Sequence, residues 1–239
     1  MTADVRPRRR VAELMDQPGL DAREHRQALT ALGRANAVSR TVGVIWPAIR
    51  QAARAVEGTP LRILDVASGG GHVAVGLARR AALDGVAVEI TGYDLSALAV
   101  DYARALAAGA GATSVRFAVA DVTNGPWPAV ADVVVCCLFL HHLADEEAVA
   151  LLRRLRSAAR QLVVVSDLRR SRTGSLLAWM GCRLLSRSRV FHVDGPRSVA
   201  AAFTTAEARA LADGAGLAGA RVTEHWPQRW VLTWRGREA

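Results

Sequence analysis

The chain has 239 residues, which is enough for one α/β domain with a full hydrophobic core. Its 31 basic residues are all arginine and outnumber the 22 acidic residues, so the formal net charge is +9. The absence of lysine excludes a Schiff-base mechanism and a lysine general base. Because the arginines are spread along the chain, we interpret the charge mainly as a solvated surface. No apolar run reaches the ~18 residues of a membrane-spanning helix.

The three cysteines are Cys136, Cys137 and Cys182. The first two are adjacent within an apolar run and cannot easily bridge each other. The odd number of cysteines and the lack of a Cys/His metal spacing favour reduced, buried thiols. We therefore expect a cytoplasmic protein.

The N-terminal part of the chain lacks any strand-like stretch. Residues 1–10 include the arginine cluster at positions 8–10 and are predicted to be a disordered basic tail. Residues 11–57 carry alanine and leucine at helical spacing. The sequence therefore predicts a helical cap segment over 1–57 and a main domain over 58–239, separated by the break at Thr59-Pro60.

From residue 61 onward, apolar strands alternate with helices. The strands are uniformly apolar, which is typical of a parallel sheet covered on both faces. The pattern predicts strands at 61–66, 86–93, 114–119, 131–138 and 161–166, and helices at 71–82, 96–108 and 145–158.

After Asp167 the composition changes. Residues 168–203 are arginine-rich and are expected to form a lid-like insertion. Within it, 174–190 is expected to be one amphipathic helix, which either packs on the core as an ordinary lid helix or roofs a hydrophobic substrate, with its arginines outward or toward anionic lipid. A helix over 204–216 and two antiparallel strands at 220–226 and 230–234 complete the chain. The predicted fold is a Rossmann-like, doubly wound, mostly parallel seven-stranded sheet with an antiparallel C-terminal hairpin.

A glycine-rich turn follows the first strand, and its sequence matches two different ligand-binding motifs. Residues 69–74 match G-x-G-x-x-A, the dinucleotide fingerprint. The pattern Asp65-x-Ala67-x-Gly69-x-Gly71 resembles motif I of the class I S-adenosylmethionine-dependent methyltransferases, with Ala67 in place of the usual first glycine. A carboxylate at position 65 suits a cationic amine better than a pyrophosphate.

The resemblance covers residues 60–166 well, and it implies further contacts with S-adenosylmethionine. Asp94 suits the two ribose hydroxyls, although Asp94 or Ser96 could instead simply cap the next helix. In the resembled family, Asp121 contacts the exocyclic amine of adenine, a role without a counterpart in dinucleotide enzymes. The expected cofactor-binding residues are Asp65, Ala67, Gly69, Gly71, Asp94, Leu95, Asp121, Val122 and Leu138.

Residues 138–143, followed by the acidic run at 145–147, resemble small-molecule methyltransferases of bacterial secondary metabolism. This resemblance implies a small hydrophobic or aromatic acceptor with a phenolic hydroxyl. A phenol has a pKa of about 10, so its proton has to be removed, and a neutral histidine is a suitable base. His141 and His142 are the candidate catalytic residues, and the alternative for each is a packing role.

Several alternatives remain at this stage. No metal is expected, because no carboxylates cluster between Leu138 and Leu143, and the lack of an N/D-P-P-Y/F motif argues against a nucleic-acid substrate. C-methylation of a quinone or polyketide, or a non-catalytic cofactor-binding role, stays open. An NAD-dependent oxidoreductase is disfavoured, because the usual Tyr-x-x-x-Lys pair is impossible without lysine. The sequence leaves the oligomeric state open.

Overall fold

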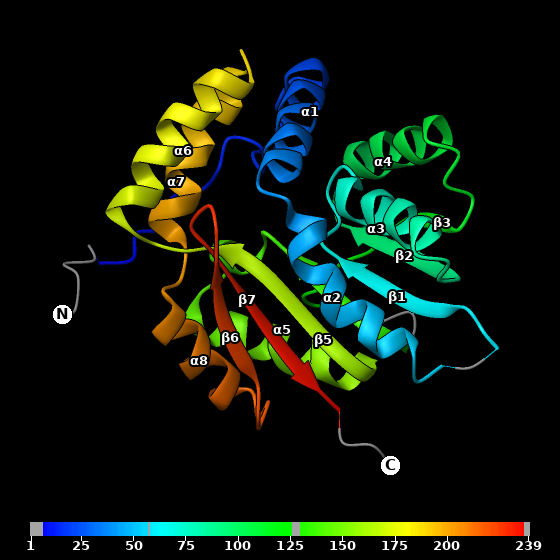
Figure 1. Cartoon of the computed structure of the whole chain (residues 1–239). Helices are drawn as coiled ribbons and strands as arrows, with labels where there is room; N and C mark the ends of the chain where they lie inside the picture. Colours follow the sequence, from blue (N-terminus) through cyan, green and yellow to red (C-terminus); the bar gives the residue numbers. More distant parts are fainter. Residues whose placement is uncertain (1–6, 57, 126–129, 237–239) are drawn as a thin grey trace.

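The computed structural model describes residues 7–56, 58–125 and 130–236, and a seven-stranded sheet forms its centre (Figure 1). The strand order is β3-β2-β1-β4-β5-β7-β6, with β1 to β5 parallel and β7 antiparallel to both β5 and β6. The predicted sheet with its C-terminal hairpin is therefore confirmed. The strands are β1 Leu61–Val66, β2 Val88–Asp94, β3 Val115–Val119, β4 Ala131–Cys137, β5 Ala159–Leu168, β6 Arg221–His225 and β7 Arg229–Arg235.

Helices cover both faces of the sheet. This explains why polar and apolar residues do not alternate along the central strands. All seven residues of β4 are buried. Alternate side chains enter two separate cores: Val133 and Val135 join one, and Val134 and Cys136 the other. The first core is covered by α2 (Thr41–Ala53), α3 (His72–Leu83) and α4 (Ala97–Gly109), and the second by α5 (Asp145–Ala158) and α8 (Thr205–Gly214).

Three further helices form a cap beyond the carboxyl ends of the parallel strands. They are α1 (Ala22–Val38), α6 (Arg172–Leu185) and α7 (Arg189–Ala201). Ala31, Cys182 and Phe191, one from each helix, make a small core of their own. The predicted N-terminal cap and the lid-like insertion thus pack against each other, whereas α2 belongs to the core of the sheet.

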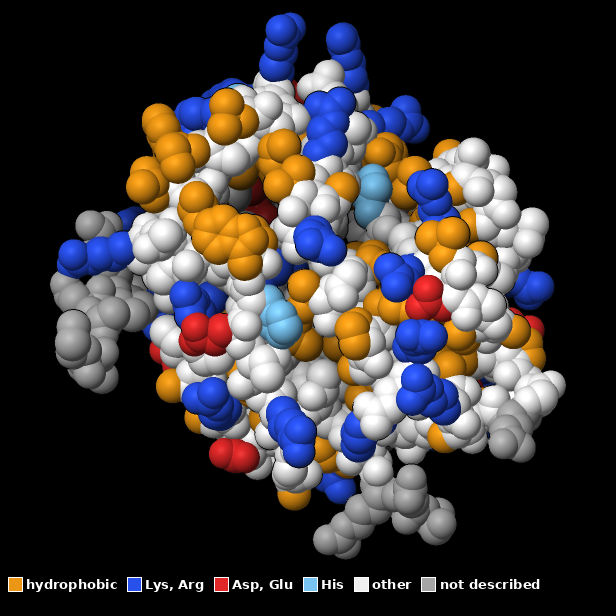
Figure 2. Space-filling model, in the orientation of Figure 1, with side chains coloured by type: hydrophobic (Ala, Val, Ile, Leu, Met, Phe, Trp, Pro, Cys, Tyr) orange, Lys and Arg blue, Asp and Glu red, His pale blue; other side chains and the backbone are white. Residues whose placement is uncertain are grey.

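The lid is two helices rather than the single helix expected over 174–190. Helix α6 ends at Leu185 because Ser186 is extended, and the Ser188 side chain caps α7 by accepting from the Phe191 N–H. The apolar side chains of α6 form an exposed patch in place of a buried roof, visible over α6 in Figure 2: they are Leu176, Trp179, Met180 and Leu184. Contact of this patch with an anionic membrane surface stays a prediction.

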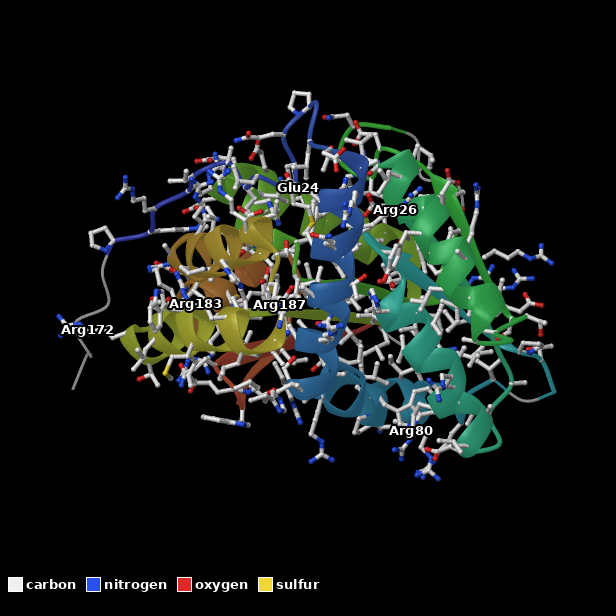
Figure 3. The ribbon with its side chains drawn as sticks, turned by 90° about the horizontal axis from the view of Figure 1, so that it is seen from above. Glu24, Arg26, Arg80, Arg172, Arg183 and Arg187 are labelled. Atoms are coloured by element: carbon white, nitrogen blue, oxygen red, sulfur yellow. The ribbon has the colours of Figure 1, made fainter. Side chains whose placement is uncertain are left out.

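Seen from above, α1 lies between the α6–α7 pair and the α3–α4 pair (Figure 3). Arg187 lies beside the end of α6 nearest to α1, and Arg172 lies at its opposite end (Figure 3). The three cysteines are free and buried, as predicted. In the part of the chain that the structure describes, every helix is too short or too polar to cross a bilayer.

The start of the described N-terminal region differs from the expected basic tail and from the helical structure expected from residue 11. Helix α1 begins only at Ala22, capped by Asp21, and residues 7–20 form an irregular segment that we call the N-terminal strap. Arg8 anchors the strap: its guanidinium stacks 3.6 Å from the Phe203 ring centroid, and its Nε donates to the Ala201 carbonyl at 2.7 Å. Residues 1–6 lie outside the described residues.

Gly92 offers a direct test of packing at the carboxyl end of β2. A Cβ at this position would lie 2.5 Å from the Phe117 ring and 2.9 Å from Ser68 Oγ. Gly92→Ala should therefore lower the free energy of unfolding by roughly 1–3 kcal/mol, measured by urea denaturation. The matched control is Gly109→Ala at the end of α4, where nothing lies within 4 Å; equal losses for both variants would contradict the packing argument.

Candidate active site

Asp65, next to the last residue of β1, has a buried carboxylate that lacks a full set of partners. Its side chain is 1% exposed, and Oδ2 accepts no hydrogen bond from the described residues. Burial, reinforced by the nearby charge of Asp94, raises the pKa of Asp65 to about 7. Since a buried carboxylate oxygen without a donor is costly, this atom marks a place where a ligand donor or cation would be stabilised.

The glycine turn is held by Asp94 at the end of β2. Asp94 Oδ2 accepts from the Gly69 N–H at 2.7 Å, and Oδ1 accepts from the Ser96 N–H at 2.9 Å. The residue that caps α4 is Ser96, whose Oγ accepts from the Ala99 N–H. Gly69 has a φ of +51° and open space where a Cβ would lie. The structure thus brings Asp65, Gly69 and Asp94 together around an open turn.

The remaining predicted cofactor residues occupy neighbouring strand ends. Leu95 is 70% exposed beside Asp94, while Val122 is buried. Asp121 accepts from the Thr123 and Asn124 N–H groups at 2.8 and 3.0 Å. The Thr123 hydroxyl and these N–H groups lower the pKa of Asp121 to about 2. This carboxylate is therefore fixed by its own turn.

The residues that directly follow β1 and β4 adopt unusual backbone conformations. Ala67 and Leu138 both have positive φ values, +55° and +57°, where L-residues are uncommon. The Leu138 N–H still donates to the Ser166 carbonyl at 2.8 Å. Gly71 also has a positive φ, +74°, and a Cβ there would lie 2.6 Å from the Phe117 ring. The carboxyl edge of the sheet thus concentrates backbone strain where the predicted ligand residues gather.

His141 lies in the short 3₁₀ helix after β4 and is held between two carboxylates. Its Nδ1 is 2.7 Å from Asp167 Oδ1 at the end of β5, and its Nε2 is 3.5 Å from Glu13 Oε1 of the strap. The side chain is 4% exposed. Burial alone would lower the pKa of His141, but Asp167 and Glu13 outweigh it and raise the pKa to about 10. His141 is therefore cationic at neutral pH.

His142 has different surroundings, although the two imidazole centroids are only 4.2 Å apart. Its Nδ1 is 3.1 Å from Asp16 Oδ2, and its side chain is 25% exposed. Its ring lies against Phe139 at a centroid distance of 5.9 Å. Of the two candidate bases, His142 is the one that a substrate can reach.

The strap supplies Glu13 and Asp16, which sequence reasoning missed. Its backbone is tied to α7, since the Leu14 and Met15 N–H groups donate to the Asp194 carboxylate at 2.8 and 3.0 Å. Arg8 ties it to the turn after β4, donating to the carbonyls of His141 and Leu143. No spacing in the sequence signals contacts between residues this far apart.

Glu13, His141 and His142 also offer ligand-type atoms within 4.8 Å of one another. The expectation of no metal considered only carboxylates near the end of β4, and Glu13 arrives from elsewhere in the chain. In the structure, Asp167 binds His141 Nδ1 and Ser198 donates to Glu13. These contacts account for the group as a hydrogen-bonded ion pair, and the absence of a metal stays a prediction.

The geometry described here is that of a class I methyltransferase fold, and comparisons agree with it. Residues 63–161 match a family model described as a methyltransferase domain. The match covers the segment of the chain from β1 into β5.

Among curated proteins, the demethylmenaquinone methyltransferase of Deinococcus radiodurans is 40% identical over 95 residues. That match covers 39% of this chain and 37% of the relative, so the chain spans little more than a third of it.

Solved structures share the fold over more of the chain. An O-methyltransferase-like protein of Nostoc punctiforme has a TM-score of 0.61 and 19% identity, over 88% of this chain and 60% of that one. Magnesium protoporphyrin IX methyltransferase from Synechocystis, with S-adenosylmethionine bound, has a TM-score of 0.54 and 16% identity, over 93% and 88% respectively.

The ion pairs of His141 predict a pH-dependent contribution to stability. Because its pKa is raised from 6.5 to about 10, the contribution is fully present below pH 6.5 and is lost as the pH rises through about 10. His141→Gln should cost about 3–5 kcal/mol of unfolding free energy at pH 6.5, because it leaves two buried carboxylates without their cation. The loss should shrink toward pH 10.

Urea unfolding of wild type and variant at several pH values measures this difference. The control is His142→Gln, which removes a partly exposed histidine and should cost much less. A His141→Gln loss that stays constant from pH 6.5 to 10 would contradict the assignment of a charged His141.

Proposed function

We propose that the chain is an S-adenosylmethionine-dependent methyltransferase that transfers a methyl group to a small hydrophobic acceptor, in the first instance the oxygen of a phenol. The observation that carries the proposal is the buried, unpartnered Oδ2 of Asp65 beside the open turn at Gly69. An ammonium group would supply the missing donors and the compensating charge. The methyltransferase domain over residues 63–161 supports the same cofactor.

The residues present fit this cofactor along its length. Asp65 would hold the amine of its amino-acid end, and Asp94, whose carboxylate already orients the turn, would accept from the ribose hydroxyls. Leu95 and Val122 would lie beside the adenine. When bound, the cofactor supplies a methyl group on a sulfonium, which is already activated. The protein then has to align the acceptor and shield the site from water.

In this proposal, His142 is the base that removes the proton from the acceptor hydroxyl. Asp16 would hold Nδ1 of His142, which leaves Nε2 to face an acceptor. His141 is unsuited to the task while it carries its own proton between Glu13 and Asp167. Its role would be to fix the strap, and with it Asp16, over the site.

C-methylation of a quinol-type ring is the second candidate, favoured by the similarity to the demethylmenaquinone methyltransferase. The two reactions give products of equal mass that differ in the atom carrying the methyl group. The ¹³C shift of the transferred methyl separates an aryl ether from an aryl methyl. A methyl on carbon would replace the O-methylation proposal without changing the cofactor site.

Cofactor choice can be tested together with the state of Asp65. Isothermal calorimetry should show binding of S-adenosylhomocysteine and none of NADH. Because only ionised Asp65 pairs with the amine, and its pKa is about 7, affinity should fall as the pH drops below 7. The fall should approach tenfold per pH unit. Asp65→Asn should bind more weakly and without this slope. NADH binding without a response to S-adenosylhomocysteine would overturn the proposal.

The base assignment has its own kinetic test. His142→Ala should lower turnover of a naphthol acceptor by about 10²–10⁴-fold. The variant should bind S-adenosylhomocysteine with the affinity of wild type, and it should unfold as cooperatively as wild type. Asp16→Asn, which keeps the size of the side chain, should give a smaller loss of the same kind. If His142→Ala retains full turnover across pH, the enzyme acts by proximity alone.

A further inference from the structure

Arg229 is a buried cation at the start of β7 whose guanidinium is only partly satisfied. The residue is 4% exposed, and its Nη1 has no hydrogen-bond partner among the described residues. Its Nη2 donates to Asn36 Oδ1, near the end of α1, at 3.2 Å. Burial lowers the pKa of Arg229, but a guanidinium keeps its proton in proteins.

No carboxylate within the described residues forms an ion pair with this guanidinium. Asp167 acts on it electrostatically, but both Asp167 oxygens are already taken. Oδ1 accepts from His141 and from the Leu168 N–H, and Oδ2 accepts from the His141 N–H. A buried charge without a partner is destabilising, so its retention points to an anionic ligand.

Strand register places Arg229 on the same face of the sheet as two other unsatisfied polar atoms. Ser166 pairs with Val231 on β7 and with Cys137 on β4. Since alternate residues of a strand share a face, Arg229 lies on the face of Ser166. Asp65 pairs with Val135, two residues before Cys137, and is on that face too. Ser166 Oγ and Asp65 Oδ2 are both buried and without partners among the described residues.

We propose that Arg229 Nη1, assisted by Ser166 Oγ, binds an anionic oxygen of the methyl acceptor, a carboxylate or a phenolate. This proposal rests on the proposed function, because it assumes that the cofactor binds at Asp65, at one end of this face of the sheet. Two strands, β4 and β5, separate β1 from β7, and Arg229 pairs with Leu168, four residues further along β5 than the level of Asp65. The two ends are therefore roughly 20 Å apart, at ~4.8 Å per strand and ~3.3 Å per residue. That separation places Arg229 beyond the cofactor's amino acid, where an acceptor would lie.

The surroundings define the rest of the acceptor. Cys137 and Val231 lie on the same face and belong to the hydrophobic core, and they offer no further charge. The acceptor class is therefore an aromatic or otherwise hydrophobic molecule with one acidic group. Asn36 covers Arg229 from α1, so the acceptor must displace this part of the cap to enter.

A matched pair of probes tests the assignment: 1-hydroxy-2-naphthoate and its uncharged methyl ester. In the presence of S-adenosylhomocysteine, calorimetry on wild type should show at least ~10-fold tighter binding of the carboxylate. Arg229→Gln should abolish this preference and leave affinity for S-adenosylhomocysteine within about 2-fold. Arg229→Lys should retain part of it. Since Arg229→Gln removes an uncompensated buried charge, its thermal unfolding midpoint should equal or exceed that of wild type.

Three results would overturn the proposal. The first is equal binding of acid and ester by wild type. The second is that Arg229→Gln binds S-adenosylhomocysteine more weakly than wild type does, while both bind decarboxylated S-adenosylhomocysteine equally well. This result would mean that Arg229 binds the carboxylate of the cofactor. The third is a lower unfolding midpoint in both Arg229 variants with the probe preference intact. Failure of wild type to bind S-adenosylhomocysteine at all would instead overturn the proposed function.

Discussion

The buried ion pair of His141 with Asp167 and Glu13 joins the ends of two neighbouring strands to the N-terminal strap. Asp167 ends β5, His141 follows β4, and Glu13 belongs to the N-terminal strap. Because both carboxylates are buried, each depends on the imidazolium for its charge. The strap that this interaction holds also carries Asp16 to His142, and it lies against α7 of the cap. The arrangement around the candidate base follows from this pairing.

The carboxyl edge of the sheet carries polar groups that the protein itself leaves unsatisfied. Asp65 lacks a donor on one side of the edge, and Arg229 lacks an anion on the other. Proteins normally pair such groups, so two opposite charges left unpaired on one face of a sheet imply ligands of opposite charge. A zwitterionic or cationic cofactor and an acidic acceptor would satisfy them in turn. The residues between them on that face, among them Val135 and Cys137, are buried and hydrophobic.

Local patterns predicted the sheet well, because each strand carries its own apolar run. Asp65, Gly69 and Asp94 could be placed for the same reason: they follow strand ends. The strap could not be predicted, since Glu13 and Asp16 meet histidines about 130 positions away through a segment without periodicity. The break in the lid at Ser186 was hidden by apolar residues that continue at helical spacing on both sides. Arg229 lies between the two predicted strands of the hairpin, and no local pattern signals its burial.

On this proposal, the carboxyl edge around Asp65 and Asp94 is a formed binding site for a methyl-donor cofactor. A crystal structure of the full chain grown with S-adenosylhomocysteine tests it most directly. We expect the amine about 3 Å from Asp65 Oδ2 and the ribose hydroxyls at the Asp94 carboxylate, with Gly69 facing the ligand. Electron density for the ligand elsewhere on the protein, with Asp65 still unpartnered, would contradict it.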